Sequence, residues 1–141
     1  MVEVYAQNRA MHVSALDRVI GCVGDANVRL VRFGVPRYSD GVDMGGWTVE
    51  VHYVTADGTS DYTAVVDAQP GEDAITFTWR VPMLACKKAG EVTASVKLLG
   101  DNREWNSGIG TFRVVESYDN DPQGAQLVDS AGEVVVVRTE A

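Results

Sequence analysis

The chain contains few residues of the kinds that perform acid–base or nucleophilic chemistry. Its two histidines are His12 and His52, and His52 lies on the outward face of an alternating strand pattern, where a solvated histidine is the simplest interpretation. No serine, histidine and acid occur at a spacing that suggests a hydrolase triad. The carboxylates gather in turn-rich segments, and nothing brings two of them together in a cleft as a glycosidase requires. The sequence therefore predicts a protein that is not an enzyme and has no cofactor.

Metal sites have equally little support. Residues 119–124, DNDPQG, partly match a calcium-binding loop, but Ser130 occupies the twelfth position, where a bidentate glutamate is expected. Turn chemistry of aspartate and asparagine explains the same residues. Cys22 and Cys86 lie far apart and lack the accompanying histidines of a zinc site. We expect two free thiols and no bound metal, with a disulfide that joins two sheets as the alternative.

Charge and hydropathy exclude further classes of partner. The 141 residues include 20 acidic and 12 basic side chains, which gives a formal net charge of −8. This balance argues against a surface that neutralises phosphates and against attraction to anionic membranes, so neither nucleic acid nor membrane is an expected partner. Residues 1–10 lack the apolar core of a signal peptide, and the apolar runs are too short for a membrane helix. We expect a protein made in a cytoplasm.

Aromatic residues suggest one candidate binding platform. Trp47 and Trp79 alternate in phase with valines and other aromatics, which indicates that both belong to the core. Trp105 follows the polar residues 100–104 at the start of a strand, where core and surface positions are equally compatible with the pattern. If it is exposed, Trp105 with Tyr38 or Tyr118 would offer rings on which a sugar could stack.

The elements that must position these residues are strands. Valine is abundant, and its branched Cβ favours a pleated sheet. The clearest pattern is a hairpin of residues 47–55 and 60–67 around Ala56, Asp57 and Gly58. Further strands are predicted at residues 2–6, 27–35, 75–81, 92–98 and 105–115. Residues 11–20 fit either a strand or irregular chain. The composition of residues 36–46 and 67–74 indicates loops. Residues 83–89 are expected to form a short helical turn that ends at Gly90. Strands spaced at about ten residues predict an immunoglobulin-like antiparallel β-sandwich of seven or eight strands.

The sequence changes character after this sandwich. We expect residues 1–116 to form the domain and residues 117–141 to form a polar linker followed by one valine-rich strand. That strand contains Val134, Val135, Val136 and Val137, and four adjacent valines on an open edge would promote aggregation. The strand is therefore expected either to pair within the domain or to be exchanged with a neighbouring subunit.

The order of the motifs resembles a known family. The series begins with residues 24–36 (GDANVRLVRFGVP) and residues 40–66, which contain a glycine–tryptophan hairpin. Residues 73–98 follow, with an FTW strand, a proline, a helical turn and a strand beginning G-x-V, and residues 104–114 end the series. The series resembles the N-terminal domain of upper baseplate proteins from long-tailed phages of Gram-positive bacteria, and short prophage proteins encoded among tail genes. The matching positions are Gly24, Asp25, Phe33, Gly46, Trp47, residues 77–79, Pro82, Gly90, Val92 and Trp105.

The resemblance implies a structural part of a phage tail, with no catalytic residue to transfer. It implies contacts with other tail or baseplate proteins, a homo-oligomer, and a place in the virion after assembly in the host cytoplasm. No host-binding extension follows residue 141, so we expect a stand-alone tail protein or a fragment of a longer one. The alternative function is a carbohydrate-binding module that contacts cell-wall glycans through the aromatic platform. A bacterial surface adhesin is disfavoured because no signal peptide is found.

Overall fold

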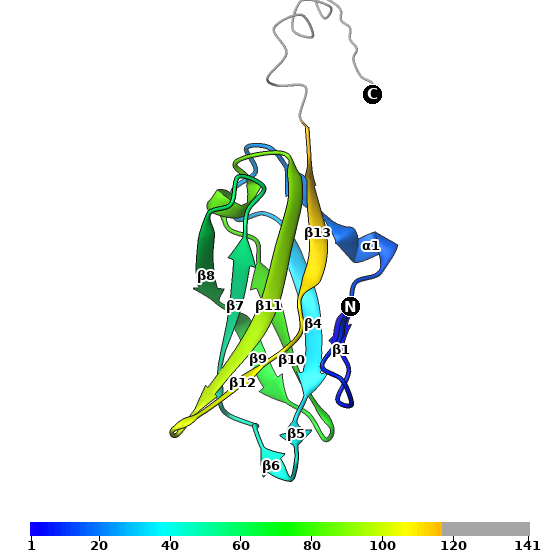
Figure 1. The fold of residues 1–141 in the computed structure, drawn as a ribbon, viewed down its shortest axis with the longest axis vertical. Coiled ribbons are helices and arrows are strands. Elements are labelled where there is room, and N and C mark those ends of the chain that lie inside the picture. Colours follow the sequence, from blue (N-terminus) through cyan, green and yellow to red (C-terminus); the bar gives the residue numbers. More distant parts are fainter. Residues whose placement is uncertain (117–141) are drawn as a thin grey trace, which may run out of the picture.

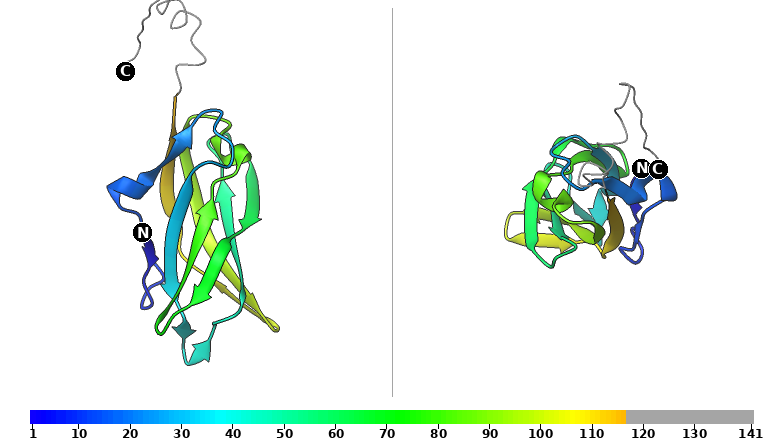
Figure 2. Two further views of the ribbon diagram at one scale, coloured as in Figure 1. Left: turned by 180° about the vertical axis from the view of Figure 1, so that it is seen from behind. Right: turned by 90° about the horizontal axis from the view of Figure 1, so that it is seen from above.

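Two β-sheets packed face to face make up the fold (Figures 1 and 2). The structure is a computed structural model and describes residues 1–116. Sheet A has the strand order β2 (Met11–His12), β1 (Val2–Val4), β4 (Leu30–Pro36), β10 (Ala74–Arg80), β9 (Val66–Pro70). Sheet B has the order β3 (Val19–Cys22), β13 (Gly110–Val115), β11 (Gly90–Gly100), β7 (Thr48–Val54), β8 (Ser60–Ala64), and β12 (Arg103–Asn106) also pairs with β11. The predicted all-β sandwich is confirmed.

Three short elements complete the described residues. A small hairpin of β5 (Tyr38–Ser39) and β6 (Val42–Asp43) lies at one end of the sandwich (Figure 1). The 3₁₀-helix η1 (Met83–Cys86) links β10 to β11, which confirms the helical turn predicted at residues 83–89. A four-residue helix, α1 (Ala15–Arg18), precedes β3 and was not predicted. Within residues 1–116, no helix has the length and hydropathy needed to cross a membrane.

The topology differs from the prediction in two respects. The sheets are mixed, because β1 runs parallel to β4 and β3 runs parallel to β13, whereas all other pairs are antiparallel. The structure also has thirteen strands in residues 1–116, which are two to eleven residues long, where seven or eight were predicted. Sheet A contains the order β4-β10-β9, and sheet B contains the order β13-β11-β7-β8. These two orders are compatible with immunoglobulin-type connectivity. The parallel placement of β1 departs from it, so the immunoglobulin-like description stays a proposal.

An aromatic cluster holds the two sheets together. Phe33 of β4 stacks on Phe77 of β10 with ring centroids 5.1 Å apart. Trp79 meets Phe112 of β13 edge-to-face at 5.9 Å, and Tyr53 of β7 at 6.0 Å. Each of these side chains is buried, and such pairs contribute about 0.5–1.5 kcal/mol beyond the area they bury. The prediction that Trp79 belongs to the core is confirmed, and Trp47 packs half-buried against its margin.

The chain changes sheet at a place where the sequence predicted one continuous strand. Residues 60–67 were expected to form the second strand of the hairpin, and residues 67–74 a turn. The structure instead ends β8 at Ala64 and starts β9 at Val66, so that residues 60–70 run along one side of the sandwich from sheet B to sheet A. Asp67 has a φ of 54°, and the β9–β10 register shifts near it. Such a bulge bends the strand and allows the switch.

A second break interrupts the strand predicted at residues 105–115. The chain forms β12 and β13 with residues 107–109 between them, and both strands pair with the same side of β11. The Ser107 hydroxyl accepts a hydrogen bond from the Val96 amide at 2.9 Å, while the Ser107 amide donates to the Val96 carbonyl at 2.9 Å. The serine thus maintains hydrogen bonding across the break, and Ile109 is left exposed.

The buried indole of Trp79 provides a test of the packing between the sheets. Its Nε1 donates to Thr63 Oγ1 of β8 at 3.1 Å. We expect Thr63→Val to lower the free energy of unfolding by about 1–3 kcal/mol, because it leaves a buried donor without an acceptor. Urea denaturation measures the change. Thr48→Val, at an exposed position of β7, is the control and should change stability by less than about 0.5 kcal/mol. Equal effects of the two substitutions would contradict the assignment.

Candidate binding surface

Two of the predicted site residues, Tyr38 and Trp105, lie within the described part of the chain, and they differ in exposure. Tyr38 is exposed on β5, with the Arg37 guanidinium 5.4 Å from its ring centroid. Trp105 is buried in β12, with 4% of its surface exposed. Tyr118, Val134, Val135, Val136 and Val137 lie outside the described residues, as does the expected division between a domain and residues 117–141.

Trp105 does not present a free ring. Its position in β12 faces inward, and the Arg9 guanidinium lies 5.0 Å from the ring centroid. Its Nε1 is buried without a hydrogen-bond acceptor in residues 1–116. A sugar stacks on an accessible aromatic face, which this side chain does not offer. The platform predicted around Trp105 is therefore not present in this arrangement.

The two cysteines are free thiols in the structure. Cys86 is buried, and burial, with smaller contributions from Asp25 and Cys22, raises its pKa to about 11. A thiol with such a pKa is protonated at neutral pH and is a weak nucleophile. No group of three or more metal-ligating side chains occurs among residues 1–116, and the DNDPQG segment lies beyond them.

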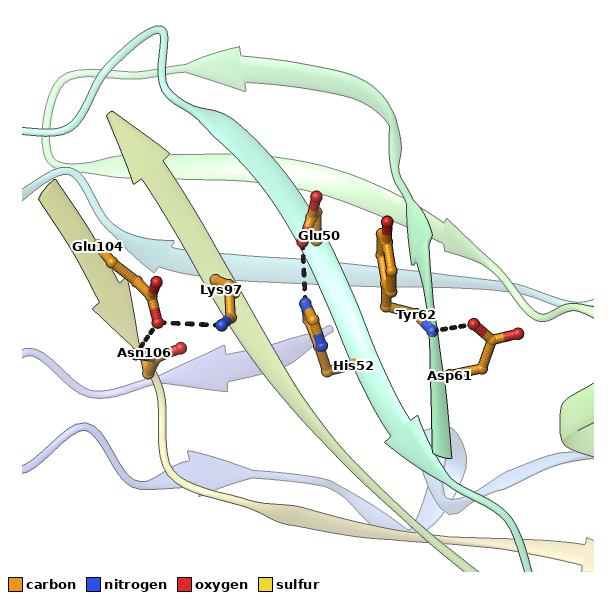
Figure 3. Close-up of polar contacts among 7 residues, drawn as sticks. All are labelled: Glu50, His52, Asp61, Tyr62, Lys97, Glu104 and Asn106. Atoms are coloured by element: carbon orange, nitrogen blue, oxygen red, sulfur yellow. Dashed lines mark hydrogen bonds and ion pairs between the residues drawn. The ribbon is translucent and has the colours of Figure 1, made fainter. Parts of the chain in front are cut away.

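The outward face of sheet B carries a polar and aromatic row that the sequence did not single out. The hairpin register places His52 of β7 opposite Tyr62 of β8. Their rings stack with centroids 4.9 Å apart and planes at 13° (Figure 3). As predicted, His52 faces outward, and its Nε2 lies 2.9 Å from Glu50 Oε1. His52 and Tyr62 are equally far in sequence from Asp57 at the centre of the turn. The sequence alone therefore indicated that these two residues lie opposite each other.

Charged side chains continue this row across β11 to β12. Lys97 donates to Glu104 Oε2 at 3.0 Å, and the Asn106 amide donates to the same oxygen at 3.0 Å (Figure 3). These contacts, that of Asn106 first, hold the pKa of Glu104 below its ordinary value. Because the pair is exposed, it adds little to stability. The Lys97–Glu104 ion pair instead fixes the positions of one positive and one negative charge on this face.

A groove lies beside the His52–Tyr62 pair, and we call it the sheet-B groove. It has a volume of about 490 Å³. Ser95 and Thr93 of β11 contribute small side chains to its lining, and Tyr62 and Ile109 are the most exposed apolar residues there, at 55% and 71%. The full lining is His52, Tyr53, Val54, Ser60, Asp61, Tyr62, Thr93, Ala94, Ser95 and Ile109. This arrangement is suited to contact. Ser95 lies opposite His52 in the β7–β11 register, but His52 Nε2 contacts Glu50 and no hydrogen bond joins Ser95 to His52 in residues 1–116.

Comparisons with known proteins give likenesses among solved structures and none in sequence. No protein-family model matches the chain, and no curated protein sequence matches it. Among solved structures, the chain is similar to the N-terminal domain of phage TP901-1 ORF48, with a TM-score of 0.44 and 10% sequence identity. The similarity covers 82% of this chain and 94% of that chain. At this level the likeness does not bear on function, which we argue from the residues.

The buried Tyr53 of β7 gives a pH dependence. Burial, with a smaller contribution from Asp61, raises the pKa of Tyr53 to about 12 from an ordinary value of 10.0. The folded state holds this proton more tightly than the unfolded state. The resulting stability is therefore present below pH 10 and is lost as the pH rises towards 12.

We expect the denaturation midpoint of Tyr53→Phe to fall less between pH 10 and pH 12 than that of the unmodified protein. The buried Cys86 thiol, which loses stability from about pH 9 to pH 11, is common to both proteins. Tyr62→Phe, at the exposed position, is the matched control and should follow the unmodified profile. Superimposable profiles for all three proteins would contradict the role of Tyr53.

Proposed function

We propose that the chain is a non-enzymatic structural component of a phage or prophage tail or baseplate. Its function is to join other tail proteins through surface contacts, and the sheet-B groove is the contact that we assign. The observation that carries the proposal is the exposure of Val54, Tyr62 and Ile109 around one groove. Exposed apolar side chains that gather on one face, with polar side chains around them, are typical of protein–protein contacts.

The motifs behind the family resemblance all serve the scaffold. Gly24 and Asp25 close the turn after β3, where the Asp25 carboxylate accepts a hydrogen bond from the Cys22 amide at 3.0 Å. Phe33 and the FTW strand build the aromatic cluster. Trp47 lies so close to Gly100 that a Cβ on Gly100 would meet its ring at 2.4 Å. A series of this kind specifies one sandwich, and its order supports the tail assignment.

The charges on the same face support recognition of a specific partner. Glu50, Lys97 and Glu104 occupy fixed positions across sheet B. Charges arranged in this way select a partner and its orientation more than they add affinity. We propose that the partners are other tail proteins and further copies of this chain, assembled in the bacterial cytoplasm into the virion tail, and that the copies form a closed symmetric oligomer.

We do not propose the carbohydrate-binding alternative. It required an exposed platform of Trp105 with Tyr38 or Tyr118. Trp105 is buried, and Tyr38 is already covered in part by Arg37. One exposed tyrosine with a cation near its ring does not make a stacking platform for a sugar.

Particles released by the bacterium that carries the gene test the proposal. We expect the chain to co-purify with tails on a density gradient, where mass spectrometry detects it, and a gene deletion to give particles with incomplete tails in electron micrographs. A cytoplasmic enzyme of the host, absent from the same fraction, is the control for contamination. A chain found only in the soluble fraction, together with normal tails after deletion, would refute the proposal.

A further inference from the structure

A second groove lies on another part of the surface, between α1, β3 and the start of β4. We call it the α1 groove, and Figure 1 shows α1 beside β13. Its volume is about 550 Å³, and it shares no lining residue with the sheet-B groove. Four exposed aliphatic side chains line it, from Leu16, Val19, Val28 and Leu30, and Leu16 and Val28 are 88% and 71% exposed. Exposed aliphatic side chains that gather in one groove mark a surface that another segment covers.

Both walls of the α1 groove are strand edges without a partner in residues 1–116. β3 is the last strand of sheet B on this side. β1 pairs with β4 only at Phe33 and Gly34, so the first residues of β4 have no strand beside them opposite β10. Open edges expose backbone donors and acceptors that an added strand can use. On β3, the Cys22 amide is already bound by the Asp25 carboxylate.

A buried donor in the same groove also lacks an acceptor. Arg29 donates from Nη2 to the Leu16 carbonyl at 3.2 Å, but its Nε is buried without a hydrogen-bond partner in residues 1–116. Buried polar groups are nearly always paired in folded proteins. An unpaired N–H on a residue that lines the groove therefore supports the packing of a further segment there.

The described chain ends beside the α1 groove. Val115 of β13 pairs with Cys22 of β3, and its carbonyl accepts a hydrogen bond from the Val23 amide at 2.9 Å. Cys22 is one of the residues that line the groove. Residues 133–138 (EVVVVR) form the most apolar run outside the described residues, and acidic Glu133 precedes the valines. We propose that the α1 groove binds this valine-rich segment of the same chain.

Length and effective concentration decide between binding in the same chain and exchange with a second copy. Residues 117–132 can span at most about 50–60 Å, whereas β11, the longest strand, extends for about 37 Å. The segment therefore reaches the groove of its own chain. A short tether gives a local concentration on the order of millimolar, above the micromolar concentration of separate chains. Binding within one chain is favoured, and this conclusion does not depend on the tail assignment.

Thermal unfolding of full-length variants tests the proposal through coupling between the two sites. We expect Val28→Ser to lower the melting temperature by about 3–6 °C in the natural sequence, since it removes a contact with the segment. In a chain whose Val134, Val135, Val136 and Val137 are all replaced by serine, the same substitution should change the melting temperature by less than about 1 °C. Ile109→Ser, at an equally exposed position of the other groove, is the matched control and should give equal shifts in both chains.

Two outcomes would overturn the proposal. Equal effects of Val28→Ser in both chains would show that the valine-rich segment does not cover the α1 groove. A coupling that disappears on hundredfold dilution, together with a solution mass above that of one chain by light scattering, would assign the groove to the segment of a second copy. Coupling that is independent of protein concentration is the result that we expect.

Discussion

The structure depends on the aromatic contact between the two sheets. Phe33, Phe77 and Trp79 from sheet A meet Phe112 and Tyr53 from sheet B in one buried cluster. Because Tyr53 and Val51 point into this cluster, the alternate residues of β7, Glu50 and His52, must point outward. A shift of one residue would reverse both faces of the strand. The core thus fixes the composition of the outward face on which we place the partner.

Much of the fold could be predicted because alternation is local. The strict patterns around Trp79 and Val96 gave β10 and β11, and the turn at Asp57 gave the β7–β8 hairpin. The switch from β8 to β9 was missed, since adjacent valines at 65 and 66 look like one strand that continues. The parallel pairs of β1 and β3 join residues distant in sequence, and no local pattern encodes them.

The candidate site was harder to predict than the fold. Whether Trp105 was buried depended on its pairing with Leu98 of β11, and the sequence pattern left that question open. Tyr62 was overlooked because its importance comes from the stacking partner across the strand. The exposure of Ile109 results from the break between β12 and β13. Surface sites of this kind are built by register and by irregularities, which sequence patterns specify weakly.

The central claim is that the protein acts through contacts of the outward face of sheet B with its partners, and not by catalysing a reaction. Incorporation of Tyr62→Ala into purified tails tests it most directly, with Met83→Ala as a control at a similarly exposed site on η1. Quantitative mass spectrometry of the tail fraction, after circular dichroism has shown that both variants fold, gives the answer. The account predicts that Tyr62→Ala is depleted from tails at least tenfold, as expected when a contact worth about 1.4 kcal/mol or more is lost, whereas Met83→Ala is incorporated normally. Equal incorporation of the two variants would contradict it.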